Sequence, residues 1–278
     1  MRVRLWGTRG SLAAPGADTA RYGGNTSCVE VRGPDGTVLV LDAGTGIRPL
    51  GRTLAGEVRR VDVLLTHLHM DHIQGLGFFA PLYDPDVETH LWGPASTILD
   101  LRGRLMRYLS PPLFPVHLRD LRRLVLHDFP AGEFAIGELR IVAEPICHPG
   151  FTVGLRIAAG SSTLTYLTDH EPALGVPSFP ASADWTSGYE LARDVDLLLH
   201  DAQYSLEEYA DHVGWGHSAI EHALVFARLT RAQHLVTFHH DPAHDDDDLD
   251  RLTAAARAAV DVACAVTVGA EGAVFELR

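Results

Sequence analysis

Residues 67–72 read His-Leu-His-Met-Asp-His, and they constrain the fold more than any other part of this 278-residue chain. They follow the short apolar run 61–65, whose length and content of valine and leucine are typical of a buried strand. Side chains two positions apart on extended backbone point to the same face, so His67 and His69 can bind one metal ion together. This segment therefore predicts a metal site at the end of a strand.

Asp71 and His72 lie where the chain is expected to turn from that strand into a helix, so they can face a second ion. Three imidazoles and a carboxylate are ligands that suit Zn²⁺, with Mn or Fe ions as alternatives. Four side chains cannot hold two ions, and other segments must supply further ligands.

Candidates for those ligands follow other predicted strands. They are His148 after the strand 139–143, Asp169 after the strand 163–167, and His239 with His240 after the strand 234–237. The end of a strand is fixed backbone, which can hold a ligand in place. The residues alone leave the last position open between His239 and His240.

Short β-branched runs recur along the chain, and helical patterns lie between some of them. Further runs typical of buried strands cover 38–41, 196–199 and 265–268. Helices are predicted over 218–231, with Ser218 as its cap, and over 249–262, after the acidic run 245–248 that suits a helix start. No linker or repeat interrupts this order, so the sequence predicts one layered α/β domain over residues 1–278.

The composition limits the partners and the location of the protein. A formal net charge of −13, with only modest basic clusters, argues against binding a long nucleic acid such as tRNA. No run of roughly 18 apolar residues predicts a membrane span. The N-terminus lacks the pattern of a secretory signal, so we expect a cytoplasmic protein. The cysteines are widely spaced and are predicted to be free thiols: Cys28, Cys147 and Cys264.

Together these motifs resemble the metallo-β-lactamase superfamily over almost the whole chain. The resemblance implies an αββα sandwich with a site for two divalent metal ions at one edge of the two sheets. It implies that the first ion is held by His67, His69 and His148, and the second by Asp71, His72 and the late histidine. It further implies that Asp169 bridges the two ions together with a hydroxide.

The resemblance also bears on residues around the ligands. The strand-then-His pattern of the superfamily favours His239 as the late ligand, with His240 or Asp241 in contact with the ligands rather than with the metal. Asp42, in Val-Leu-Asp-Ala-Gly-Thr-Gly, matches the aspartate that orients a metal-bound histidine in that family. The alternative for Asp42 is a simple role in the turn after its strand.

Two further segments resemble the ribonuclease Z branch of the superfamily. Residues 199–204, Leu-His-Asp-Ala-Gln-Tyr, are similar to its His-Glu-Ala-Thr-Phe segment, with aspartate in place of glutamate. Residues 216–223, Gly-His-Ser-Ala-Ile-Glu-His-Ala, are similar to the His-Ser-Thr segment that follows it. Carried over, Asp201 orients His217, and His217 acts as the general acid that protonates the leaving oxygen. In the same scheme Asp71 helps to position or deprotonate the nucleophile.

The chain departs from ribonuclease Z between His148 and Asp169, where that enzyme carries a long tRNA-binding arm. The interval here has room only for a turn and two strands. The chain therefore looks closer to compact relatives such as the phosphodiesterase PhnP, and we expect a small phosphodiester substrate, a cyclic nucleotide or a cyclic sugar phosphate. The segment 172–193 either walls a pocket or covers the interface of a homodimer.

Two other functions remain open at this point. A thioesterase or lactonase can use the same metal core, but it does not need the pair Asp201 and His217. A protein that binds a ligand through its metal ions without turnover is the other alternative, which the full set of ligands and the general acid disfavour.

Overall fold

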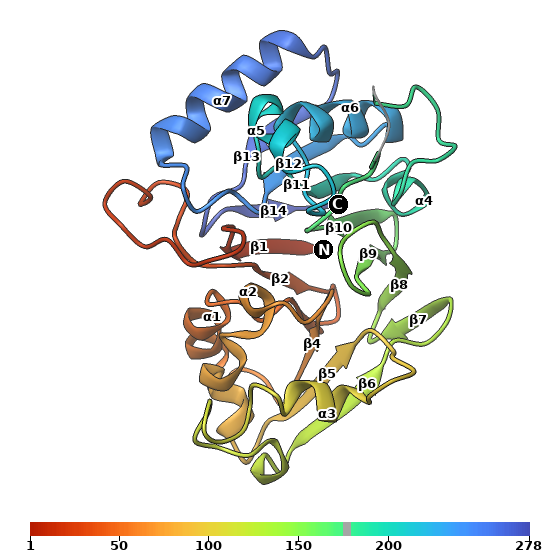
Figure 1. The fold of residues 1–278 in the computed structure, drawn as a ribbon. Coiled ribbons are helices and arrows are strands. Elements are labelled where there is room, and N and C mark those ends of the chain that lie inside the picture. The colour runs from red at the N-terminus through yellow and green to blue at the C-terminus, as the bar shows by residue number, and fades with distance from the viewer. Residues whose placement is uncertain (175–178) are drawn as a thin grey trace.

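Two β-sheets lie face to face in a computed structural model that describes residues 1–174 and 179–278 (Figure 1). The first sheet contains, in spatial order, β14 (Val274–Glu276), β1 (Arg2–Gly7), β2 (Cys28–Arg32), β3 (Val38–Leu41), β4 (Arg60–Leu64), β5 (Glu88–Gly93) and β6 (Leu124–Asp128). The second contains β13 (Ala265–Val268), β12 (His234–Phe238), β11 (Leu197–Asp201), β10 (Ser162–Leu167), β9 (Val153–Ala159), β8 (Leu139–Pro145) and β7 (Glu133–Ile136).

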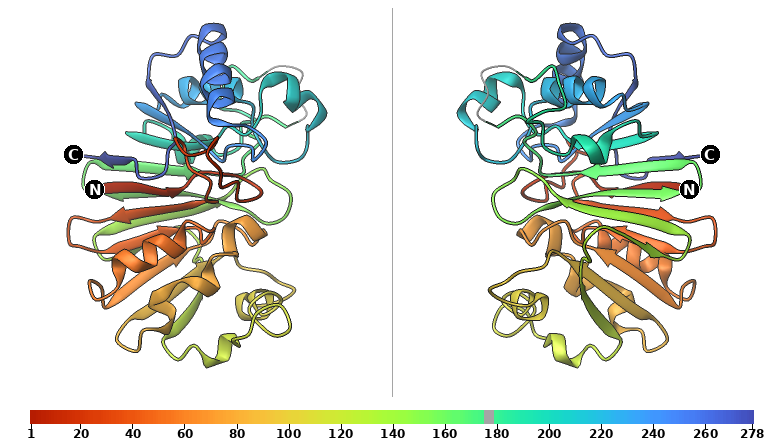
Figure 2. Two further views of the ribbon diagram at one scale, coloured as in Figure 1. Left: turned by 90° about the vertical axis from the view of Figure 1, so that its left-hand side faces the viewer. Right: turned by 90° about the vertical axis from the view of Figure 1, so that its right-hand side faces the viewer.

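Helices cover the outer face of each sheet, which gives four layers (Figure 2). On the first sheet lie α1 (Ile47–Leu54), α2 (Met70–Ile73), α3 (Leu101–Leu105) and the short 3₁₀ helices Leu76–Phe78, Ala80–Tyr83 and Leu118–Asp120. On the second lie α4 (Tyr189–Ala192), α5 (Leu206–Asp211), α6 (Ile220–Thr230) and α7 (Asp246–Ala259). The predicted αββα sandwich is confirmed.

Three hydrophobic cores hold these layers together. The middle core joins the inner faces of the two sheets through side chains such as Leu41, Leu155 and Phe238, all fully buried. The outer cores pack α1 on the first sheet, through Leu50, and α6 on the second, through Phe226. Burial of this apolar surface is the main force that fixes the sheets against each other.

Parallel pairing brings the functional segments to one edge of the sandwich. Strands β3, β4, β5 and β6 are parallel neighbours in the first sheet, and β10, β11, β12 and β13 are parallel neighbours in the second. Parallel strands end at the same edge of their sheet. The segments that follow β4, β10, β11 and β12 can therefore meet at that edge.

The predicted helices are present, but one predicted cap is wrong. The helix α7 begins as expected in the acidic run, where the Asp245 side chain accepts a hydrogen bond from the backbone N–H of Asp248. Ser218 does not cap α6, which begins at Ile220 without a side-chain cap. The Ser218 hydroxyl instead donates to the backbone oxygen of His170 at 2.6 Å.

The segment 172–193 is described except for residues 175–178, which lie outside the described residues. Phe179 packs against the His222 ring of α6, with ring centroids 5.6 Å apart. The Trp185 side chain is 92% exposed. That the segment 172–193 walls a pocket or covers a dimer interface stays a prediction.

No helix in the described part of the chain has both the length and the apolar character needed to cross a membrane.

Candidate metal centre

The segment 67–72 leaves β4 in extended form and then enters α2 at Met70. His69, the residue before the helix, has extended backbone with φ −67° and ψ 155°. This change of conformation divides the segment as the sequence predicted. His67 and His69 face one group of side chains, whereas Asp71 and His72 face another.

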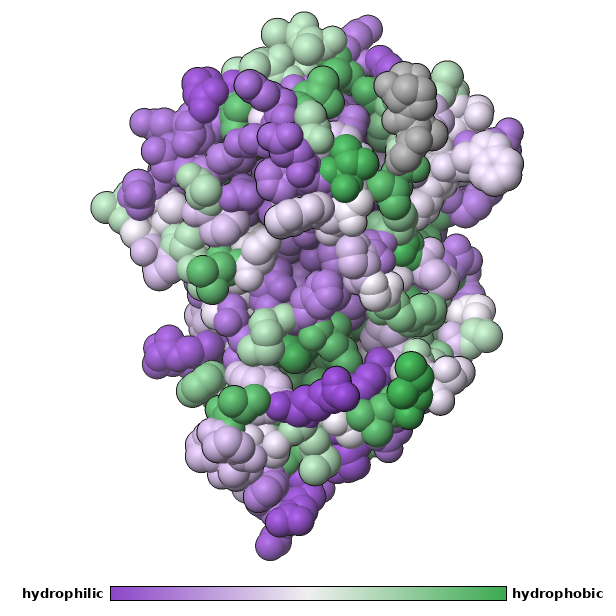
Figure 3. All heavy atoms as spheres, in the orientation of Figure 1, coloured by the Kyte–Doolittle hydropathy of each residue, from purple (hydrophilic) through white to green (hydrophobic). Residues whose placement is uncertain are grey.

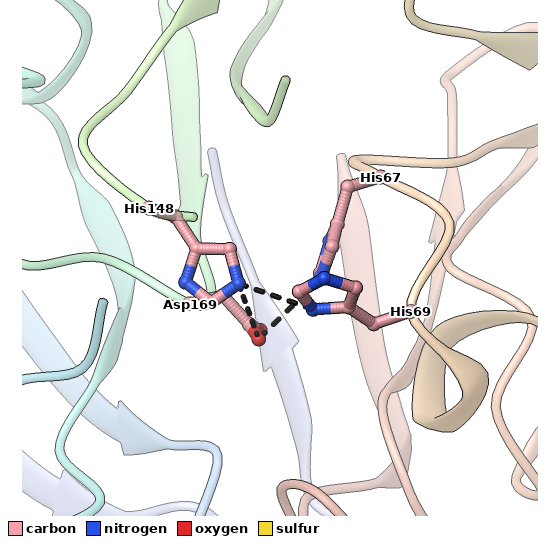
Figure 4. A group of neighbouring side chains, drawn as sticks. All are labelled: His67, His69, His148 and Asp169. Carbon is pink, nitrogen blue, oxygen red and sulfur yellow. Dashed lines mark hydrogen bonds and ion pairs between the residues drawn. The ribbon is translucent and has the colours of Figure 1, made fainter. Parts of the chain in front are cut away.

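The first group joins the two sheets. It consists of His67 and His69 from the end of β4, His148 from the loop after β8, and Asp169 from the end of β10. Figure 4 shows His148 and Asp169 approaching from one side and His67 and His69 from the other. His148 Nε2 lies 3.2 Å from His69 Nδ1, and His67 Nε2 lies 3.6 Å from Asp169 Oδ2. We call these four residues the first cluster.

A second group lies beside it and shares Asp169. It consists of Asp71, His72, Asp169 and His239, all of them buried. His72 Nε2 and His239 Nε2 each lie 3.1 Å from Asp71 Oδ2. The same two nitrogens lie 3.0 and 3.1 Å from Asp169 Oδ1. We call these four residues the second cluster.

Asp169 turns one carboxylate oxygen toward each cluster. Its Oδ2 faces His67 and His148, at 3.6 and 3.8 Å, whereas its Oδ1 faces the histidines of the second cluster. Burial alone would raise the pKa of Asp169. The rings of His239, His72 and His67 outweigh burial and hold that pKa well below its ordinary value. Asp169 is therefore an ionised carboxylate between two sets of imidazoles.

The two clusters fit divalent metal ions. The Nε2 atoms of His67 and His72 are buried and have no hydrogen-bond partner among the described residues. Buried polar atoms in proteins almost always have a partner, so these two nitrogens indicate that a group is missing between them and the carboxylates. Imidazole nitrogen and carboxylate oxygen are the donors that Zn²⁺ and other divalent transition metals prefer.

The Asp42 side chain holds one of these imidazoles in place. Its Oδ2 lies 2.8 Å from His72 Nδ1, so that ring is oriented with Nε2 toward the second cluster. Asp42 also accepts hydrogen bonds from the backbone N–H and hydroxyl of Thr66 and from the Tyr166 hydroxyl. This carboxylate is completely buried and fully used, which a simple turn residue would not need.

Three residues of this edge have left-handed backbone although none is a glycine. Asp42, Asp169 and His239 follow β3, β10 and β12, with φ of 58°, 51° and 62°. Such a conformation is unfavourable for residues with a Cβ, and it persists where the surrounding structure enforces it. At these positions the turn of the backbone directs each side chain into the site.

The structure places His239, and not His240, in the second cluster. His240 is buried, and its Nε2–H donates to the backbone oxygen of Gly269 at 2.9 Å. Its backbone N–H donates to the oxygen of Thr8. Among the described residues, the hydrogen bond of the His240 side chain is to Gly269 rather than to a ligand side chain.

Asp201 and His217 form a pair next to the second cluster. His217 Nδ1 lies 2.8 Å from Asp201 Oδ2, and the His217 ring stacks on His239 with centroids 5.0 Å apart. Burial lowers the pKa of His217, but the Asp201 carboxylate outweighs it and raises the pKa to about 9. The other Asp201 oxygen accepts the backbone N–H of Ser218, which fixes the carboxylate.

Sequence reasoning missed two residues that support His239 and Asp71. Gln203 Oε1 lies 2.9 Å from His239 Nδ1, which leaves His239 Nε2 toward the carboxylates. The backbone N–H of Ser11 donates to Asp71 Oδ2 at 2.8 Å. Gln203 stands inside the segment 199–204, so its position two residues after Asp201 was the available signal. Nothing in the sequence links Ser11 to residue 71.

Gly216 and Glu171 were also missed. The oxygen of Gly216 lies 2.9 Å from His148 Nδ1, and its N–H donates to the buried Glu171 carboxylate at 2.9 Å. Glu171 also accepts the Tyr209 hydroxyl and the N–H of Gly214. This carboxylate therefore anchors the loop that orients His148 and carries His217.

Comparison with known proteins agrees with this architecture. Residues 37–240 match the family model of the "Beta-lactamase superfamily domain". Ribonuclease BN of Cronobacter sakazakii is 25% identical over 237 residues, which are 70% of this chain and 76% of that protein. Ribonuclease Z of Methanopyrus kandleri is 31% identical over 160 residues, or 56% of this chain and 49% of that protein.

A solved structure gives the same fold over nearly the full length of the chain. A new diphosphatase from the PhnP family aligns with a TM-score of 0.70 and 18% identity, covering 100% of this chain and 98% of that one. The histidine and aspartate clusters lie at one edge of this fold. The chain belongs to the metallo-β-lactamase superfamily, is similar to ribonuclease Z and ribonuclease BN, and is a metal-dependent hydrolase.

Proposed function

We propose that this chain hydrolyses a small phosphodiester, a cyclic nucleotide or a cyclic sugar phosphate, with residues 1–278 acting as one catalytic domain. The observation that carries the proposal is the pair Asp201 and His217 beside the second cluster. A thioesterase on the same clusters has less use for a proton donor held in this way, because a thiolate leaves with less protonation than an alkoxide needs.

We propose that the two clusters bind two divalent metal ions, with Zn²⁺ as the preferred metal and Mn or Fe as alternatives. The first would be held by His67, His69 and His148, the second by Asp71, His72 and His239, with Asp169 between them. When bound, such ions act as Lewis acids toward phosphoryl oxygens and make a water molecule nucleophilic at neutral pH.

The side chains of this edge then have separate tasks. Asp71 is held by the N–H of Ser11 and by His239, so it can position the attacking water or accept its proton. Asp201 fixes the orientation of His217 through Nδ1, so Nε2 is the ring nitrogen that can act on a substrate. A proton on that nitrogen can pass to the leaving alkoxide, which is the task of a general acid.

The interval between His148 and Asp169 supports a small substrate. It holds only the hairpin of β9 and β10, whose strands pair in antiparallel register, so there is no arm for gripping RNA. The net charge of −13 adds repulsion toward a long polyanion. A small monoanion meets this repulsion far less, because the ions at the clusters dominate its local field.

Turnover of bis(p-nitrophenyl) phosphate against an acyl thioester tests the proposal. The phosphodiester should be hydrolysed with a much higher kcat/KM than the thioester. The reverse preference would identify an acyl hydrolase, and activity on neither ester would identify a binding protein. Cyclic mononucleotides should be turned over and tRNA precursors should not.

The variant His217→Ala tests the role of the pair. It should keep its metal and lose about 10²- to 10⁴-fold in rate on phosphodiesters with poor leaving groups, as expected for a missing general acid. The loss should be smaller for p-nitrophenyl esters, whose leaving group needs little protonation. An equal loss for good and poor leaving groups would show that His217 binds or packs instead.

A further inference from the structure

A cavity of about 710 Å³ opens directly beside the first cluster. His67 and His69 line its inner end, and the loops after β5 and β8 form its sides. A volume of this size is typical of small-molecule sites. Because it begins at the metal ligands, a phosphodiester bound at the clusters would extend one of its two ester groups into this cavity.

The walls of the cavity are largely apolar. Leu68, Pro149, Phe151 and Ile98 line it, and the last two are large hydrophobic side chains that are 56% and 93% exposed. In Figure 3 hydrophobic side chains gather on this face over the region between α2 and α3. Exposed apolar side chains grouped around a hollow indicate a binding surface rather than ordinary surface scatter.

One guanidinium interrupts this apolar wall. Arg104 of α3 lines the cavity and also an adjoining hollow of about 500 Å³, so it stands where the two meet. Its side chain is only 18% exposed, and its Nε is buried without a hydrogen-bond partner among the described residues. Its Nη2 donates to the backbone oxygen of Pro94 and lies 3.9 Å from Asp128. A planar guanidinium in such a place suits a flat group that carries hydrogen-bond acceptors.

We infer that this cavity binds a nucleobase, so that the substrate is a nucleotide diester rather than a sugar phosphate. The inference rests on the proposed function and narrows it. A base offers a flat apolar face to Phe151 and Ile98 and an acceptor edge to Arg104. The hydroxyls of a sugar could reach Ser96, Thr97 or Thr152, but a sugar has no flat apolar face to cover the large hydrophobic side chains. Stacking of one base on apolar and aromatic side chains corresponds to about 10- to 100-fold in affinity.

Two esters with the same leaving group test the inference: methyl p-nitrophenyl phosphate and the p-nitrophenyl ester of thymidine 5′-monophosphate. The second should be preferred about 10- to 100-fold in kcat/KM, chiefly through KM. Phe151→Ala and Arg104→Met should each lower that preference. Phe78→Ala, which removes a 60% exposed aromatic ring outside the cavity, should leave that preference unchanged.

The possible failures are distinct. Turnover of both esters with no preference, or a preference that Phe151→Ala does not lower, overturns the nucleobase cavity and leaves the phosphodiesterase in place. Turnover of neither ester overturns the proposed function. In that event calorimetric binding of thymidine 5′-monophosphate against methyl phosphate decides the inference, since equal affinities, or a difference that survives in Phe151→Ala, overturn it.

Discussion

Replacing Asp42 by asparagine should separate the orientation of a metal-binding histidine from the packing around it. In the native chain Asp42 Oδ2 receives two donors, His72 Nδ1–H at 2.8 Å and the Tyr166 hydroxyl at 2.9 Å. The other oxygen receives the backbone N–H and the hydroxyl of Thr66. In Asp42→Asn the amide oxygen can still accept the hydrogen bonds from Thr66. The NH₂ group then faces the two donors of His72 and Tyr166, and it cannot accept a hydrogen bond from either.

The structure sets the size of the effect. Each buried donor left without an acceptor costs about 1–3 kcal/mol, so the variant should lose about 2–6 kcal/mol of unfolding free energy. His72 can recover one contact by moving its proton from Nδ1 to Nε2, but a protonated Nε2 cannot bind a metal. Loss of such an orienting contact typically weakens metal affinity about 10- to 100-fold.

Tyr166→Phe is the matched control, because it removes one of the same two donors and leaves the hydrogen bond from His72 to Asp42 intact. It should cost about 1 kcal/mol and should not alter metal affinity. Denaturant unfolding gives the first quantity, and competition with a chelator gives the second. Native metal affinity in Asp42→Asn, together with the expected loss of stability, would refute the reasoning about the proton on His72.

Three further predictions follow from individual residues. Gly216→Ala should lose metal and activity, because an added Cβ would lie 2.2 Å from the His148 ring. Gly272→Ala is the control: it has a similar positive φ but open space, and should lose only about 1–2 kcal/mol of stability. Equal metal content in the two variants would contradict this reasoning. Mass spectrometry should find about two ions per native chain and fewer in Asp169→Ala, and equal stoichiometries would remove its bridging role. Burial would raise the pKa of Glu208, but hydrogen bonds from His244 and Ser205 lower it to about 2 from an ordinary 4.5. The ionised Glu208 side chain therefore stabilises the folded protein fully above pH 4.5, and this contribution disappears as the pH falls toward 2. The stability gap between native protein and Glu208→Gln should therefore be wide near about pH 6 and should narrow near about pH 3, and a constant gap would count against it.

The elements that the sequence predicted are those whose own residues determine them. Strand β3 contains only buried valine and leucine, and its predicted bounds match the structure. The acidic start of α7 is also local, because Asp245 bonds to a neighbour three residues away. Grouping of the seven expected ligands into two clusters followed from a resemblance rather than from local pattern, and the structure brings all seven together.

The features that sequence reasoning missed depend on distant partners. Ser218 has the residue type of a cap, but its hydroxyl is drawn to His170, 48 positions away in the sequence. The residues alone left the late ligand open between His239 and His240, and only the family resemblance favoured His239, whose left-handed backbone turns it into the site. Gln203 acts on a ring 36 positions away. Such choices belong to the packed fold, which no local pattern encodes.

The clusters draw on both sheets, and this determines when in the life of the protein the metal can enter. Asp71 and His239 are 168 positions apart in the sequence, and they meet only after both sheets have formed and docked. Closing so long a loop around an ion would cost much entropy in an unfolded chain. The complete clusters therefore form with the folded scaffold, unlike the compact site of a zinc finger, which folds around its zinc ion. During synthesis the nascent chain cannot retain them in both clusters until its last strands have emerged, so the metal reaches a finished scaffold and its removal should leave the scaffold standing.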